Sequence, residues 1–205
     1  MKVAIVGGTG DFGLALARQI VEGGSQVVIG SRDAERAAEK GSEVGASGAA
    51  NEDAVCGVDL VVLAVKADAA LATAESLASA IGATPVLSVA SELRFTKQGV
   101  FPGDEGESIA ERTQRLLQGP VVAGLHSLAA ASLAHGKADG DALLCGDDAD
   151  AKELAIELAA SIVTGRALDA GPLASARALE GMTAVIVNLN KRYRAHAGVQ
   201  VTGLP

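Results

Sequence analysis

The sequence predicts an α/β fold, in which helices flank a doubly wound parallel sheet and a small C-terminal α/β extension follows. Short apolar segments of strand length alternate with longer, helix-like segments along most of the chain. A glycine-rich turn comes directly after the first apolar segment. This alternation implies parallel strands that are joined by crossover helices.

The glycine-rich turn follows a short apolar strand at residues 1–6 and leads into an amphipathic helix. Gly8, Gly10 and Gly13 form a G-x-G-x-x-G pattern there. The first glycine allows a tight turn, the second lets a pyrophosphate approach the backbone, and the third lets helix and strand pack closely. The free amides of the helix N-terminus face the anion. In this setting the pattern indicates a Rossmann-type dinucleotide site, with a purely structural glycine turn as the alternative.

The end of the second strand, Gln26–Ile29, indicates which dinucleotide binds. An NAD site usually carries Asp or Glu at this place, to accept hydrogen bonds from the ribose 2′-hydroxyl. Here Ser31 can donate to a 2′-phosphate and Arg32 can pair with it. Arg36 lies one helical turn further on, and Thr9 faces the same place from the glycine turn. We therefore expect NADP(H), unless the two arginines are only solvated helix charges.

The remaining elements continue the alternation. Further strands are expected at residues 60–65, 85–89, 121–125, 142–145 and 166–169. Helices are expected at residues 34–41, 52–56, 69–80, 107–117, 149–163 and 173–193. Residues 43–51 are weakly patterned, and residues 90–106 are expected to form a loop. We expect an approximate boundary near residue 125, between an NADP-binding domain, residues 1–125, and a C-terminal part, residues 126–205, that packs on it.

Composition limits the class of protein. The 205 residues suffice for one substantial core, and no apolar run reaches the length of about 18 residues that a membrane helix needs. The net charge of −8 argues against a nucleic-acid partner. No signal peptide is evident. Cys56 and Cys145 lie in apolar segments and are expected to be buried free thiols, which suits a reducing, cytoplasmic location.

His126 is the candidate catalytic residue. It follows a predicted strand, and open α/β sheets bind ligands at the carboxyl ends of their strands. Ser127, Leu128 and Ala130 next to it would let a flat ring approach backbone amides. Hydride transfer requires mainly that two reacting carbons are held close together in a dry site. The alternative is a structural histidine, and His135 and His196 are expected at the surface.

Two further features bear on the reaction. Short-chain dehydrogenases need a Tyr-x-x-x-Lys pair, but Ala197 stands four residues after Tyr193, the single tyrosine. That chemistry is therefore not expected. Lys191, Arg192 and Arg194 lie in a C-terminal segment without acidic residues. They either complement the dipole of the last helix or attract an anionic tail of a second ligand.

Five blocks of sequence resemble a known family in the same order along the chain. The chain is similar to the reduced coenzyme F420:NADP oxidoreductases, also called NADPH-dependent F420 reductases. The blocks are residues 7–13, 30–32, 124–130, 145–148 and 168–173. They span nearly the whole chain, and the last is more specific than the glycine turn, which many families share.

The resemblance implies hydride transfer between NADP(H) and the 5-deazaflavin coenzyme F420. It implies that the C-terminal part completes the deazaflavin site and that His126 and Leu128 border the ring. The backbone amide of Ala130 would bind the nicotinamide carboxamide, and Leu204 in the C-terminal tail would help cover the deazaflavin. The 2′-phosphate would be held by Thr9, Ser31, Arg32 and Arg36.

The same resemblance implies a homodimer, for which the apolar helical segment Met182–Leu189 is a candidate contact. The full set of predicted cofactor-binding residues is Gly8, Thr9, Gly10, Asp11, Phe12, Gly13, Ser31, Arg32, Arg36, Ser127, Leu128, Ala130 and Leu204. Two other functions stay open. One is an NADP-dependent reductase of another small acceptor, such as a flavin or a ferric chelate. The other is a non-catalytic NADP(H)-sensing protein.

Overall fold

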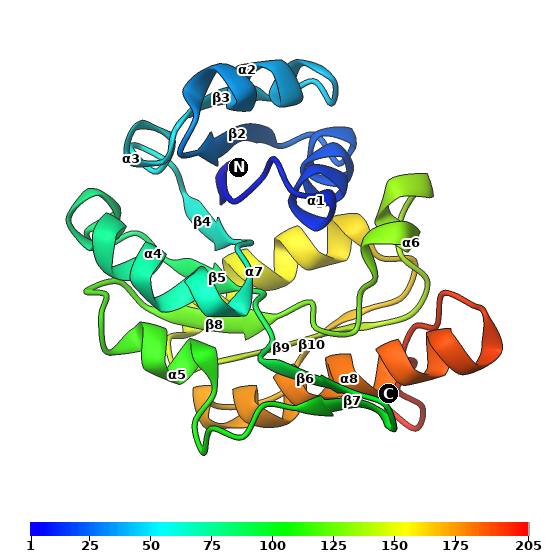
Figure 1. The fold of residues 1–205 in the computed structure, drawn as a ribbon. Coiled ribbons are helices and arrows are strands. Elements are labelled where there is room, and N and C mark those ends of the chain that lie inside the picture. The colour runs from blue at the N-terminus through cyan, green and yellow to red at the C-terminus, as the bar shows by residue number, and fades with distance from the viewer. Residues whose placement is uncertain (205) are drawn as a thin grey trace.

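A computed structural model describes residues 1–204 and contains an eight-stranded sheet with the strand order β10-β9-β8-β5-β4-β1-β2-β3 (Figure 1). The strands are β1 Lys2–Val6, β2 Gln26–Ser31, β3 Ser47–Ala50, β4 Leu60–Leu63, β5 Val86–Ser88, β8 Val121–Gly124, β9 Ala142–Gly146 and β10 Ala167–Asp169. From β3 to β8 all neighbours are parallel, whereas β9 runs antiparallel to β8 and β10 runs parallel to β9. The predicted doubly wound α/β fold is therefore confirmed.

Helices cover both faces of this sheet. They are α1 Asp11–Glu22, α2 Ala34–Ser42, α3 Asn51–Ala54, α4 Ala67–Ile81, α5 Ile109–Gln114, α6 Ala130–His135, α7 Ala149–Ile162 and α8 Ala176–Tyr193. A 3₁₀ turn, Leu173–Ser175, precedes α8. Figure 1 shows α2 and α8 at opposite ends of the molecule. Among the described residues, no helix combines the length and the apolar character that a membrane crossing requires.

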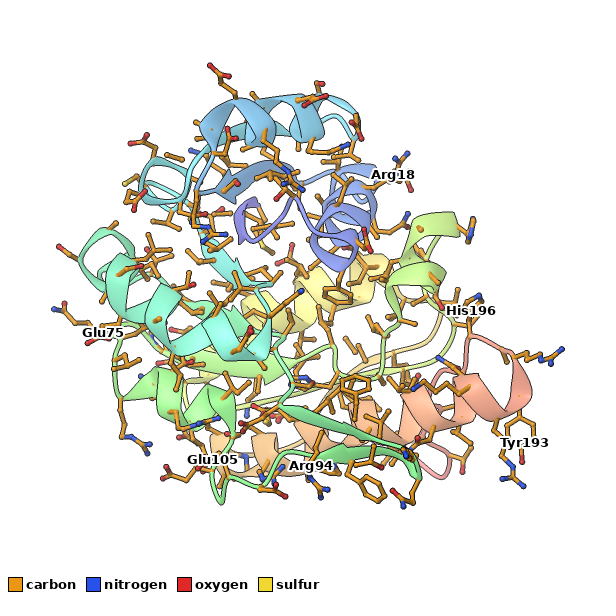
Figure 2. All side chains as sticks on the ribbon, in the orientation of Figure 1. Arg18, Glu75, Arg94, Glu105, Tyr193 and His196 are labelled. Carbon is orange, nitrogen blue, oxygen red and sulfur yellow. The ribbon has the colours of Figure 1, made fainter. Side chains whose placement is uncertain are left out.

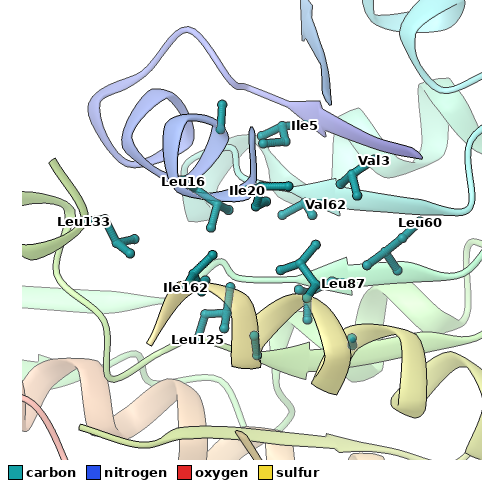
Figure 3. Close-up of a cluster of buried hydrophobic side chains, with 14 of the residues drawn as sticks. Val3, Ile5, Leu16, Ile20, Leu60, Val62, Leu87, Leu125, Leu133 and Ile162 are labelled. Carbon is teal, nitrogen blue, oxygen red and sulfur yellow. The ribbon is translucent and has the colours of Figure 1, made fainter. Parts of the chain in front are cut away.

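Alternation along each strand divides the core into two layers, because successive side chains point to opposite faces of a sheet. Val3 and Ile5 of β1 face the layer that α1 and α7 cover, and Figure 3 shows them with Leu16 and Ile162 in this cluster. The intervening Ala4 and Val6 face the layer of α4, α5 and α8. Since both faces are buried, the central strands are apolar at nearly every position.

The strand order places a topological switch point between β1 and β4. From β1 the chain winds outward through β2 to β3, and it then crosses back to β4 on the other side of β1. The two halves diverge there, which leaves a crevice at the carboxyl ends of the strands. Residues that follow β1, β4, β5 and β8 therefore gather at one edge of the sheet.

The segment 90–106 differs from the expected loop. It contains an antiparallel hairpin of β6 Leu93–Thr96 and β7 Gly99–Pro102, and this hairpin lies against α8 (Figure 1). The side chain of Asn188 on α8 accepts from the Val100 amide at 2.9 Å and donates to the Val100 carbonyl at 2.7 Å. These hydrogen bonds join residues that are 88 positions apart in sequence, so the local sequence of residues 90–106 did not indicate a hairpin.

Two smaller expectations also need correction. Residues 43–51, which are weakly patterned, include the edge strand β3, where Gly48 packs against the backbone at Ala37 too closely for any side chain. Cys56 is exposed, whereas Cys145 is buried as expected. Cys56 belongs to the turn after α3, where Val55 and Val58 point into the core and leave the thiol outside.

The C-terminal part continues the same sheet. β9 pairs with β8, so the segments before and after residue 125 share one row of strands. The described C-terminal tail returns to this edge, where the Asp141 carboxylate accepts from the amides of Arg166 and Val201, both at 2.8 Å. The division at residue 125 stays a prediction.

Candidate functional site

A cleft of about 750 Å³ lies at the carboxyl ends of β1, β4, β5 and β8. Its lining residues are Gly10, Asp11, Phe12, Gly13, Ala64, Val65, Lys66, Ala67, Asp68, Val89, Ala90, Ser91, Leu93, Phe95, Leu125, His126, Leu128 and Thr183. The glycine turn and the His126 segment are more than 100 positions apart in sequence, yet they border one space. The lining is mostly apolar, as a flat organic ring requires.

The glycine turn has the geometry of an anion cradle. Gly7 has a φ of +81°, so the left-handed residue of the turn comes just before the G-x-G-x-x-G pattern. A Cβ on Gly8 would lie 2.8 Å from Ile29, and a Cβ on Gly13 would lie 2.7 Å from the Gly7 oxygen. A Cβ on Gly10 would make only an ordinary van der Waals contact, 3.5 Å from the Gly7 oxygen, so this position is less crowded than Gly8 or Gly13.

The N-terminus of α1 leaves amides available at this turn. Gly10 caps the helix with extended backbone and no side-chain hydrogen bond. Leu14 is the first helical residue whose amide bonds back, to the Gly10 carbonyl at 2.8 Å. The first turn of an α-helix otherwise has unsatisfied donors and a partial positive charge, and a phosphate group fits both.

The residues predicted to hold the 2′-phosphate come from the glycine turn, the end of β2 and the start of α2. The Gly7 amide donates to the Gly30 carbonyl at 3.2 Å, which joins the turn that holds Thr9 to the end of β2 that holds Ser31. Asp33 caps α2 by accepting from the Arg36 amide at 3.0 Å. Arg32 and Arg36 are exposed, and neither side chain forms an ion pair within residues 1–204. Both guanidinium groups are thus free for an anion.

His126 is the second residue after β8 and is only 5% exposed. Its Nδ1 is 3.1 Å from the Ser91 hydroxyl, which is itself 2.7 Å from the Thr183 hydroxyl. The Thr183 hydroxyl donates to the His126 carbonyl at 2.9 Å. Burial lowers the pKa of His126 to about 4, so the imidazole is neutral at neutral pH. Its Nε2 has no hydrogen-bond partner within residues 1–204.

The residue before His126, Leu125, has a strained backbone conformation. Leu125 has a φ of +66°, in the left-handed region that side-chain-bearing residues seldom adopt. Its carbonyl accepts from the Leu128 amide at 3.0 Å, and its own side chain is buried in the core. The chain thus turns sharply at the end of β8, and strain of this kind is characteristic of functional sites.

Several predicted cofactor residues do not line the cleft. Ser127 is buried, and its hydroxyl donates to the Asp141 carbonyl at 3.3 Å, so this group is used within the fold. Ala130 is half-buried at the start of α6, and Leu204 is 50% exposed. Their roles toward a ligand remain predictions. His135 and His196 are exposed as expected, and Figure 2 shows His196 at the periphery of the molecule.

The cleft includes residues that were not expected. Val65 and Lys66 follow β4, and the rule that ligands bind at strand ends could have identified them. Leu93 and Phe95 come from the hairpin, whose sequence reads as a loop. Thr183 lies in the middle of α8, where a single hydroxyl gives no signal. The Nζ of Lys191 is 5.4 Å from the centroid of the Phe95 ring, so one C-terminal cation lies at the rim of the cleft.

The blocks at residues 145–148 and 168–173 lie at the opposite edge of the sheet, because β9 and β10 run against β8. There the Asp147 carboxylate accepts from the Leu173 amide at 2.9 Å, and the Asp169 carboxylate accepts from the Gly171 amide at 2.8 Å. Lys152 pairs with Asp169 at 2.9 Å. These blocks therefore shape the entry into α8 and do not contact the cleft.

The fold and the cleft define a dinucleotide-binding protein of the Rossmann class. The family described as NADP oxidoreductase, coenzyme F420-dependent, matches residues 2–92. An F420-dependent NADP reductase of Methanothermobacter thermautotrophicus is 36% identical over 227 aligned positions, which cover 100% of this chain and 96% of that protein. Another, of Methanocaldococcus jannaschii, is 33% identical and covers 100% of this chain and 99% of its own. The chain belongs to the F420-dependent NADP reductase family.

Solved structures support the fold. A chain of Arthrobacter sp. FB24, described as a candidate F420-dependent NADP reductase, superposes with a TM-score of 0.84. The match covers 99% of this chain and 100% of that one, at 24% sequence identity. At this identity the likeness concerns the architecture alone.

Proposed function

We infer that the protein is an NADPH-dependent F420 reductase, which transfers a hydride between NADP(H) and coenzyme F420. The observation that carries this inference is the shared cleft, which the glycine turn borders on one side and His126 with Leu128 on the other. Two flat rings in one apolar cleft can face each other, and hydride transfer requires little more than such placement. Membership of the family supports the identity of both cofactors.

The NADP(H) side fits the residues present. The pyrophosphate would lie at the N-terminus of α1, where Gly10 leaves space for its approach. The 2′-phosphate would be held by Thr9, Ser31, Arg32 and Arg36, since the two guanidinium groups form no ion pair within residues 1–204. An Asp or Glu at the last position of β2 would repel that phosphate, and β2 instead ends in Ser31, which Arg32 follows; the carboxylate of the next residue, Asp33, accepts from the Arg36 amide.

The deazaflavin side also fits the residues present. A tricyclic ring needs an apolar lining with a few polar anchors. Leu93 and Leu128 supply apolar surface, and the Nε2 of His126, which has no hydrogen-bond partner within residues 1–204, supplies one anchor. We assign His126 as the catalytic residue in the sense that it touches the ring. The amide of Ala130 and the side chain of Leu204 complete the proposed set.

We also propose that the protein is a cytoplasmic homodimer that binds no nucleic acid. Val185 and Leu189 on α8 are exposed apolar side chains within the segment expected to meet a partner. The exposed thiol of Cys56 suits a reducing compartment, and the net charge of −8 opposes binding to nucleic acid. Light scattering tests the dimer, because a monomer has the 20.4 kDa mass of the chain.

A panel of acceptors tests the activity. The purified protein with NADPH is offered F420, a flavin and a ferric chelate, and NADPH oxidation is followed for each. We expect turnover with F420 that exceeds the others by at least about a hundredfold, as differential binding of about 3 kcal/mol gives. A preference for the flavin or the chelate would contradict the proposal. NADPH binding without turnover of any acceptor would favour a sensing protein.

A further inference from the structure

The hydroxyl groups of Ser91 and Thr183 form a short relay with His126, and the directions of its hydrogen bonds can be worked out. A carbonyl oxygen only accepts hydrogen bonds, so the Thr183 hydroxyl must donate its single proton to the His126 carbonyl. At the next contact Ser91 must then donate to Thr183. The Ser91 proton is thereby used, and His126 Nδ1 must donate to the Ser91 oxygen.

The relay determines the tautomer of the imidazole. A neutral histidine carries one ring proton, and here that proton is on Nδ1. Nε2 is left with a lone pair and no donor, since it has no partner within residues 1–204. His126 is only 5% exposed, and it lines the cleft. A buried acceptor without a partner costs free energy that a ligand donor can recover.

We propose that Ser91 and Thr183 are positioning residues that hold His126 in the Nδ1-protonated tautomer, so that Nε2 accepts a hydrogen bond from a ring N–H of the bound deazaflavin. The identity of this ligand rests on the proposed function. The relay spans three elements: His126 follows β8, Ser91 follows β5, and Thr183 belongs to α8. The tautomer therefore depends on how α8 packs across the end of the sheet.

The first test needs no cofactor. Nitrogen-15 NMR of the free protein distinguishes a protonated from an unprotonated ring nitrogen, and the chain has only three histidines to resolve. The signals of His126 are assigned by their loss in His126→Gln. At pH 7 we expect Nδ1 protonated and Nε2 unprotonated. The reverse assignment in the wild-type protein would overturn the proposal, whatever the enzyme turns over.

Matched variants separate the relay from simple packing. Thr183→Val keeps the shape of the side chain but removes the acceptor of the Ser91 proton, so Ser91 becomes free to donate to Nδ1 and the ring proton moves to Nε2. Thr183→Ser keeps the hydroxyl and should keep the wild-type tautomer. Ser91→Ala removes the hydroxyl that accepts the Nδ1 proton, and Ser91→Thr keeps it, so these two variants form the corresponding pair at Ser91.

Ligand affinity is the second readout. In Thr183→Val and Ser91→Ala we expect the Kd of F420 to rise about tenfold, the scale of one hydrogen bond, with the Kd of NADP unchanged. Equal weakening of both cofactors would show that the nicotinamide carboxamide or the fold is affected instead, and would contradict the proposal. An unchanged tautomer in Thr183→Val would overturn it as well. Loss of F420 turnover with the expected wild-type tautomer would refute the proposed function alone.

Discussion

At the scale of single residues, charge at the end of β2 decides between the two nicotinamide dinucleotides. Arg32 has no acidic partner within residues 1–204, so its guanidinium is available to the 2′-phosphate of NADP. We predict that Arg32→Ala weakens NADP binding by roughly 1.5–3 kcal/mol, the value of a charge-assisted hydrogen bond, and has little effect on NAD. Titration of both nucleotides by calorimetry measures the difference.

Arg18→Ala is the matched control for this prediction. Arg18 is also exposed, but it lies beyond the first turn of α1 (Figure 2). This variant also removes one positive charge and should leave both affinities unchanged. An equal loss for NADP and NAD in Arg32→Ala would place the 2′-phosphate elsewhere.

The candidate site was predictable to the extent that local sequence and strand order determine it. Gly10 and Gly13 belong to a local pattern, and His126 follows a strand whose carboxyl end the alternation indicates. Ser91 and Thr183 were not predictable, because 92 residues separate the two hydroxyls and only tertiary packing joins them. Phe95 was missed for the same reason, since its hairpin depends on Asn188 of α8.

At the scale of elements, the join between β1 and α1 has two glycines with different purposes. A Cβ on Gly13 would lie 2.7 Å from two backbone atoms that cannot move independently. We predict that Gly13→Ala lowers the free energy of unfolding by about 1–3 kcal/mol, the usual cost of overpacking, although alanine favours the helix. Urea denaturation measures it.

Gly10→Ala is the complementary change. Its Cβ would meet nothing closer than 3.5 Å, so the loss of stability should be limited to the poorer helix cap that alanine provides and be smaller than in Gly13→Ala. The methyl group would instead occupy the space that a pyrophosphate approaches, and NADP affinity should fall. Normal NADP binding by Gly10→Ala would contradict the placement of the pyrophosphate at this turn.

Elements with strong local patterning matched their predictions. β1, β2 and α1 each combine a regular apolar pattern with neighbouring glycines, and these signals predicted that the elements exist, although β2 extends to Ser31, two residues beyond the predicted end at Ile29. β3 was missed because Ser47–Ala50 consists of small residues, and its pairing with β2 and its packing on α2 stabilise it instead. The exposed Cys56 shows that an apolar neighbourhood in sequence does not set the direction of one side chain.

At the scale of the whole molecule, Glu180 connects α8 to α5 across one layer of the core. Its carboxylate is buried and accepts from the amides of Ile109 and Ala110, both at 3.1 Å. Burial raises the pKa of Glu180 to about 7, against the opposing effects of those amides and of Arg112 and Arg177. Between pH 4.5 and about pH 7, the Glu180 carboxyl is therefore mostly protonated in the folded protein and mostly ionised in the unfolded chain.

This difference makes stability fall as pH rises. The folded-state pKa is above the unfolded value, so the contribution of Glu180 is most favourable below pH 4.5 and is lost progressively up to about pH 7. We predict that wild type loses about 3 kcal/mol relative to Glu180→Gln between pH 4 and pH 8. Urea unfolding at both pH values measures this, and parallel pH profiles of the two proteins would refute it.

The whole molecule brings two cofactor surfaces to one cleft, and the central claim is that a hydride passes directly between them. The most direct test uses NADPH that carries deuterium at one of its two C4 positions, with oxidised F420 as acceptor. We predict that mass spectrometry finds one deuterium at C5 of the reduced deazaflavin for one of the two labelled diastereomers. Reduced F420 without deuterium from either diastereomer, or no reduction at all, would contradict the account.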